Sequence, residues 1–171
     1  QQRGRPRLFG HHAGAKRVRE IVEACPDLGV EYLTIFAFST ENWHRPNHEV
    51  RVLMSLFRRH ILREVDELTM SGVRVRFIGQ RARLPRNLQN LMAMMEARTA
   101  ANDRLTLQIA ISYGARAEIA EAVRDLAREV EAGRLSPAEI DEDAISAALS
   151  TGGERDPDLV MREIELSIGR L

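Results

Sequence analysis

The sequence lacks most of the features that would place it in a specialised class. Cys25 is its only cysteine, which excludes an internal disulfide framework and a cysteine-based zinc cluster, and agrees with a reducing, cytoplasmic compartment. No apolar stretch approaches the roughly 20 residues of a membrane-spanning helix. The sequence therefore predicts neither a disulfide-stabilised secreted domain nor an integral membrane protein.

Net charge is also absent. Lysine plus arginine and aspartate plus glutamate number 25 each, so no global field draws the chain to nucleic acid. The glycine-rich loops of P-loop NTPases and dinucleotide-binding proteins are missing, which argues against a kinase or a dehydrogenase. Residues 1–19 are a local exception, because their charged side chains are all basic. That segment is therefore a candidate anion-binding segment.

What the sequence does contain is an alternation of strand-like and helix-like segments. The length of 171 residues suits one domain, residues 1–171, with a core large enough to need no disulfide. The alternation predicts an α/β fold, a single domain with a mainly parallel central sheet flanked by helices around an apolar tunnel. Strands are predicted at 32–38 (YLTIFAF, covered on both faces), 73–79, 105–111 and 158–162, and helices at 13–25, 50–72, from Pro85, and at 119–133.

Reactive side chains are densest directly after the first predicted strand, in FSTENWHRP (38–46). Ligands of parallel α/β sheets usually bind at the carboxyl ends of the strands, which makes this loop a candidate site. A structural interpretation is equally open from these residues alone, in which Ser39 or Thr40 caps a turn and Trp43 plugs the end of the sheet. His44 and His48 lack a third ligand, so we predict no metal site among the residues present.

The segment AFSTENWHRP resembles the signature AFS-(S/T)-ENW-x-RP of the cis-prenyltransferase family at every fixed position. Further segments resemble the family in the same order: RPRLFGHHAGAKRV, LGVEYLTIFAF, GVRVRFIG, LTLQIAISYGARAEI and DPDLVMR. The resemblance runs from about Arg3 to Arg162. It implies an enzyme of the undecaprenyl diphosphate synthase type, which adds isopentenyl diphosphate units to farnesyl diphosphate with cis double bonds. It also implies Mg²⁺ as cofactor, a homodimer, and a place at the inner face of the membrane through the lipid product.

The resemblance assigns Arg7 and His11 to the allylic diphosphate, together with Arg45 from the signature loop. Physical chemistry agrees, because arginine offers two parallel donors to a diphosphate and a histidine at a helix start adds another. Taken singly, Arg7 is better explained as a solvated loop residue and His11 as a helix-start hydrogen bond; together with Arg45 they favour ligand binding. The family match further places Ser39 and Asn42 near the reacting groups. Asn42, Ser39 and Arg45 are therefore the predicted catalytic residues.

The remaining predicted residues bind the substrates. Phe38 would flank the first isoprene units, and Ala37 would leave room in a tunnel lined also by the helix at 50–68 and by Leu105 and Leu107. Trp43 and Glu49 resemble residues of a segment that closes over the isopentenyl site, although a packing plug and a helix-start carboxylate are the plainer interpretations. Arg162 matches the arginine that grips the diphosphate of isopentenyl diphosphate.

The sequence also departs from the family pattern. It begins at Gln1 without the Asp-Gly-Asn-Gly-Arg-Trp segment, whose aspartate is the family's metal ligand, and the match ends after Arg162, before the family's last helices. Ser112 stands where the family has asparagine, and Ala115 where it has glycine. These departures keep an alternative open, in which the chain is a noncatalytic or truncated member that binds prenyl diphosphates or partners an active subunit.

Overall fold

The computed structural model describes residues 17–159. They form two compact units, one ending at Glu121 and the other beginning at Ala122. The expected single domain over residues 1–171 stays a prediction.

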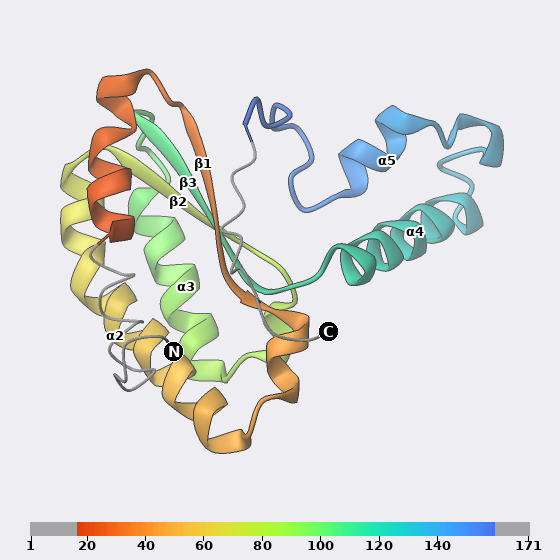
Figure 1. The fold of residues 1–171 in the computed structure, drawn as a ribbon. Helices are drawn as coiled ribbons and strands as arrows, with labels where there is room; N and C mark the ends of the chain where they lie inside the picture. The colour runs from red at the N-terminus through yellow and green to blue at the C-terminus, as the bar shows by residue number, and fades with distance from the viewer. Residues whose placement is uncertain (1–16, 160–171) are drawn as a thin grey trace, which may run out of the picture. The chain divides into compact units, whose positions relative to one another are not determined.

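The first unit contains a sheet of three parallel strands (Figure 1). Their order is β1 (Tyr32–Ser39), β3 (Leu105–Tyr113), β2 (Val73–Ile78). The central strand β3 is buried along almost its whole length, including its polar residue Gln108. The parallel α/β architecture and three of the predicted strands are confirmed.

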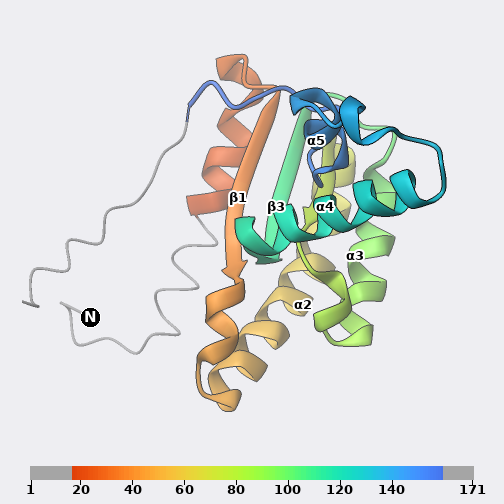
Figure 2. The ribbon, with the colours of Figure 1, turned by 90° about the vertical axis from the view of Figure 1, so that its right-hand side faces the viewer.

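Helices cover one face of this sheet (Figure 2). They are the helix over residues 17–24, α2 (Asn47–Met70) and α3 (Arg86–Thr99). Their apolar residues at helical spacing enter a common core with the strands. Met92 and Met95 of α3 are 0% and 2% exposed, so these two methionines are core residues, as the sequence indicates.

The prediction that residues 32–38 are covered on both faces is wrong for one face of β1. The side chains of Tyr32 and Phe36 are 41% and 59% exposed, whereas Phe38 is 1% exposed. The reason is that the helices pack only on the face of β1 that carries Leu33, Ile35 and Ala37. An apolar run alone does not distinguish a strand covered on one face from a strand covered on both.

The second unit holds most of α4 (Ala115–Glu131) and the short helix α5 (Glu142–Ala148). The chain leaves α4 at Gly133, whose φ of 69° is the left-handed conformation that glycine favours after a helix. Asp158 and Leu159 are irregular, and the rest of the predicted strand at 158–162 lies outside the described residues. Within residues 17–159 no helix has the length and apolarity needed to cross a membrane.

Candidate functional site

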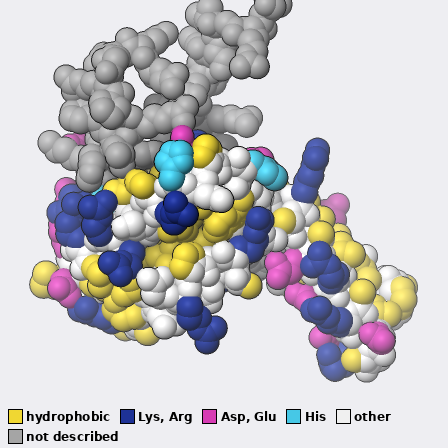
Figure 3. Space-filling view, turned by 90° about the horizontal axis from the view of Figure 1, so that it is seen from below, with side chains coloured by type: hydrophobic (Ala, Val, Ile, Leu, Met, Phe, Trp, Pro, Cys, Tyr) yellow, Lys and Arg dark blue, Asp and Glu magenta, His cyan; other side chains and the backbone are white. Residues whose placement is uncertain are grey.

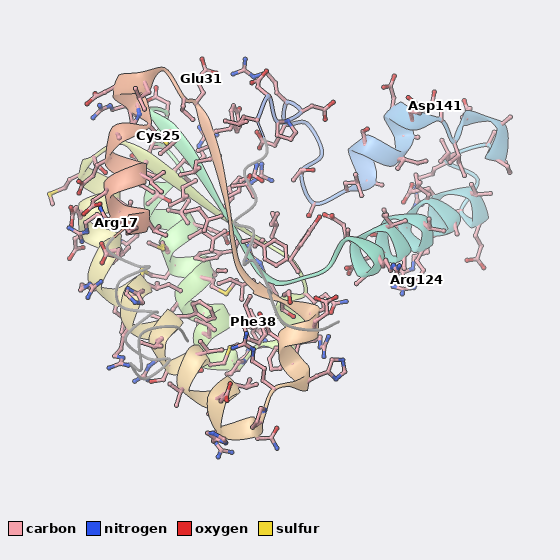
Figure 4. All side chains as sticks on the ribbon, in the orientation of Figure 1. Arg17, Cys25, Glu31, Phe38, Arg124 and Asp141 are labelled. Atoms are coloured by element: carbon pink, nitrogen blue, oxygen red, sulfur yellow. The ribbon has the colours of Figure 1, made fainter. Side chains whose placement is uncertain are left out.

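A cavity of about 730 Å³ lies between the sheet and the helices of the first unit. That volume is in the range of small-molecule sites. The cavity runs from Phe38 and Ile111, at the carboxyl ends of their strands, to Val73, at the amino end of β2. These are opposite ends of the sheet because the strands are parallel; Figure 4 labels Phe38 at one end of β1 and Glu31 near the other. The apolar wall between them includes Ile35, Ala37, Leu53, Phe57, Ile61 and Leu107.

The signature loop, residues 38–46, forms the end of the cavity that lies beside the carboxyl ends of the strands. After β1 the chain makes the 3₁₀ turn η2 (Thr40–His44), in which the backbone N–H of Ser39 donates to Asn42 Oδ1 at 3.1 Å. This bond fixes the Asn42 amide with its nitrogen as a remaining donor. Asn42 lines the cavity, and no described residue accepts from its Nδ2. Ser39 thus positions Asn42 through its backbone.

Arg45 lines the same end of the cavity. Its Nη1 lies 3.9 Å from Oε2 of Glu49, in the first turn of α2, and its side chain is 41% exposed. A pair this long and this exposed holds the guanidinium only weakly. Arg45 and Asn42 therefore present a charged donor and a neutral donor to the mouth of an apolar cavity.

Trp43 is not among the residues that line the cavity. Its ring meets Phe38 edge-on at 5.2 Å between centroids, and its Nε1–H donates to Oγ of Ser112 at 2.9 Å. Phe38 lines the cavity and Trp43 packs against its ring, in agreement with the packing interpretation of Trp43. The closing role of Trp43 and Glu49 stays a prediction. Ser112 is completely buried and has a φ of 56°, a conformation in which asparagine is favoured over most residues.

We predict that Ser112→Ala frees the indole of Trp43. The substitution removes one hydrogen bond worth about 1 kcal/mol and leaves a half-buried N–H without its acceptor. Because Trp43 is the only tryptophan, its fluorescence reports the change directly, as a shifted emission maximum together with a lower midpoint of denaturation. Ser71→Ala, which removes a hydroxyl at the other end of the sheet, is the control. Identical emission spectra for the two variants would contradict the predicted role of Ser112.

Charged side chains border the opposite end of the cavity, and sequence reasoning missed them. Arg19 donates to Glu67 Oε1 at 2.7 Å and also pairs with Glu64. Burial opposes ionisation of Glu64, but hydrogen bonds from Arg63 and Arg19 outweigh it and lower its pKa. Because that pKa is below its ordinary value, the stabilisation is present at neutral pH and is lost as the pH falls through the acidic range.

The structure brings together Ala37, Phe38, Asn42 and Arg45 at one cavity. Ser39 lies at the start of the loop, where its backbone N–H donates to Asn42. Of the wall residues expected from the sequence, Leu107 and much of α2 line the cavity, whereas Leu105 is buried in the core instead. Arg7, His11 and Arg162 lie outside the described residues.

The implied Mg²⁺ stays a prediction. Within residues 17–159 no three His, Cys, Asp or Glu side chains gather closely enough to hold a metal ion. Among the carboxylates that line the cavity, Glu64 and Glu67 pair with Arg19.

Comparison with known proteins supports the family resemblance that the signature loop indicates. Residues 1–165 match the model of a prenyltransferase family described as "Putative undecaprenyl diphosphate synthase". The chain belongs to this family. It is 51% identical over 162 residues to a ditrans,polycis-undecaprenyl-diphosphate synthase ((2E,6E)-farnesyl-diphosphate specific) of Xanthomonas axonopodis pv. citri, an alignment that covers 95% of this chain and 63% of the relative. It is 48% identical to an isoprenyl transferase of Agrobacterium fabrum, over 95% of this chain and 66% of the relative.

The fold is shared with solved members of the same family. The structure of lavandulyl diphosphate synthase from Lavandula x intermedia, in complex with dimethylallyl diphosphate, superposes with a TM-score of 0.84 at 34% identity. That superposition covers 88% of this chain and 64% of the other. The chain thus spans less than two thirds of the length of each of these three proteins.

Proposed function

We propose that the protein is a cis-prenyltransferase that extends farnesyl diphosphate with successive isopentenyl diphosphates and releases a polyprenyl diphosphate of the undecaprenyl type. The observation that carries this proposal is an apolar cavity whose mouth is formed by Asn42 and Arg45 of the family signature. A prenyl diphosphate has the same two parts, a hydrocarbon chain and an anionic head. The farnesyl specificity of the Xanthomonas relative supports the choice of starter.

In this proposal the residues at the mouth hold and stabilise the anion. The guanidinium of Arg45 donates to the diphosphate oxygens, where negative charge grows as the allylic C–O bond breaks. The Asn42 amide nitrogen, fixed through its oxygen, is a second donor that needs little reorganisation. The double bond of isopentenyl diphosphate attacks the cation-like allylic carbon, and loss of a proton then gives the cis double bond.

The cavity wall contributes by excluding water. A carbocation-like carbon reacts with water if it meets any, so an apolar wall built from Ala37, Leu53 and Leu107 protects it. The same wall receives the growing chain as it moves away from Arg45 towards the amino end of the sheet.

Three further features are part of the proposal. Mg²⁺ would supply electrophilic assistance to departure of the diphosphate. We also propose a homodimer, working in the cytoplasm at the inner face of the membrane, where its lipid product partitions. Sedimentation of the purified protein and fractionation of cells would test these two statements.

Incorporation of radiolabelled isopentenyl diphosphate by the intact protein tests the function. With farnesyl diphosphate and Mg²⁺ we expect labelled, butanol-soluble products several isoprene units longer than the starter. Omitting the starter, or adding a chelator, should abolish incorporation. If the intact, folded protein binds farnesyl diphosphate and incorporates no label, the catalytic proposal fails and the noncatalytic alternative replaces it.

A further inference from the structure

A second hollow lies on the other side of α2. It has a volume of about 550 Å³ and lies between α2, the 3₁₀ turn η3 (Arg81–Arg83) and the start of α3. It shares no lining residue with the cavity, because α2 turns Leu53 and Phe57 to one side and Met54 and Arg58 to the other. We name it the arginine pocket; its lining residues are Trp43, Val50, Arg51, Met54, Ser55, Arg58, Arg83, Leu84, Pro85, Asn87 and Leu88.

The rim of the arginine pocket is positively charged without compensation. Arg51, Arg58 and Arg83 line it, and no carboxylate does. Arg51 and Arg58 form no ion pair with any other residue of the described range, unlike Arg19 or Arg81. In a chain with no net charge, this local excess of cations is a candidate anion site.

The start of α3 adds to the positive potential. Pro85 is the N-cap residue and has no side-chain acceptor, so the first turn of this 14-residue helix is uncapped. The amide N–H groups at an uncapped helix start carry partial positive charge. Ser55 and Asn87 provide neutral polar groups at the same rim.

The floor of the pocket is apolar. Val50, Met54, Leu84 and Leu88 are buried beneath it, and the face of Trp43 stands 5.2 Å from the Arg83 guanidinium. Seen from below, arginine side chains surround an area of apolar surface (Figure 3). An inorganic anion would use the rim alone, whereas a phosphate that carries a hydrocarbon chain would use rim and floor together.

We propose that the arginine pocket binds the phosphate group of a small amphiphile, a phosphate ester of an apolar chain. Arg51 and Arg58 would hold the phosphate oxygens, and the chain would lie on Met54, Leu84 and the indole of Trp43. This site is separate from the cavity of the proposed function and requires no catalysis. Its ligand is either a soluble ester or a phospholipid headgroup, which share this chemistry.

Fluorescence of Trp43, the only tryptophan, gives a direct binding assay. We expect a saturable change on titration with octyl phosphate, because the phosphate draws Arg83 from the indole. Arg51→Gln and Arg58→Gln should each raise the Kd at least fivefold, and both side chains are exposed, so folding should be unaffected. Arg124→Gln on α4 is the matched control and should leave the Kd unchanged. Arg45→Ala should also leave it unchanged, since Arg45 belongs to the cavity.

Two results would overturn the proposal. One is a Kd that is insensitive to Arg51→Gln and Arg58→Gln, or sensitive only to Arg45→Ala. The other is inorganic phosphate binding as tightly as octyl phosphate, which would leave the apolar floor without a role. Flotation with phosphatidylglycerol vesicles, against phosphatidylcholine vesicles, distinguishes the two ligand sources: arginine-dependent flotation identifies a headgroup, and octyl phosphate binding without flotation identifies a soluble ester. None of these readouts depends on prenyl transfer, so this proposal and the proposed function fail separately.

Discussion

Arg45→Ala is expected to lower kcat/KM for farnesyl diphosphate about ten- to a hundredfold. The guanidinium lies at the cavity mouth and is only weakly held by Glu49, so it is available to the diphosphate. A hydrogen bond to a charged group contributes about 1.5–3 kcal/mol, which converts to that range. If Arg45 stabilises the departing diphosphate more than the bound substrate, kcat falls along with kcat/KM. Steady-state incorporation of labelled isopentenyl diphosphate measures both constants.

Two further variants show whether the loss is specific. Arg45→Lys should recover part of the activity, because it restores the charge without the two parallel donors. Arg124→Ala removes an equally accessible arginine from α4 and should keep full activity. The melting temperature should be the same for all three variants, since both arginines are exposed. Equal kcat/KM for Arg45→Ala and Arg124→Ala would exclude Arg45 from the site.

Much of this site could be predicted from sequence because it is contiguous. The loop from Phe38 to Arg45 follows a strand directly, and the rule that ligands bind at the carboxyl ends of parallel strands points to the end of the sheet where Phe38, Asn42 and Arg45 line the cavity. The three strands were also predictable, since short apolar runs between helix-like segments have few other interpretations. Local patterns suffice where the chain itself brings the residues together.

Contacts between distant segments could not be predicted in this way. The bond from Trp43 to Ser112 joins residues 69 positions apart, and Arg19 meets Glu64 across 45 positions. The strand order β1-β3-β2 among the described residues is not the sequence order, and Phe36 is exposed on the face of β1 that does not pack on the helices. The two sides of α2 also share one amphipathic pattern, so periodicity alone does not show that one side borders a cavity and the other an arginine-rimmed pocket.

Ala37→Phe is expected to lower kcat/KM for farnesyl diphosphate by at least about fivefold and to shorten the products. Ala37 lies on the face of β1 that lines the cavity, where its small side chain leaves space for a hydrocarbon chain. A phenyl ring there competes with the substrate for that space, and forcing extra atoms into packed surroundings costs about 1–3 kcal/mol, or roughly five- to a hundredfold. Chromatography of the labelled products gives their lengths, and steady-state kinetics gives the rate.

The same strand offers a matched control for this substitution. Thr34→Phe introduces the same ring on the exposed face of β1, away from the cavity, so product length and rate should be those of the unmodified protein. Ala37→Val adds less bulk and should give an intermediate effect, which separates loss of space from loss of folding. Unfolding curves for all variants identify any that are merely unstable. If Ala37→Phe folds and makes products as long, and as fast, as Thr34→Phe does, then the hydrocarbon chain does not occupy this cavity.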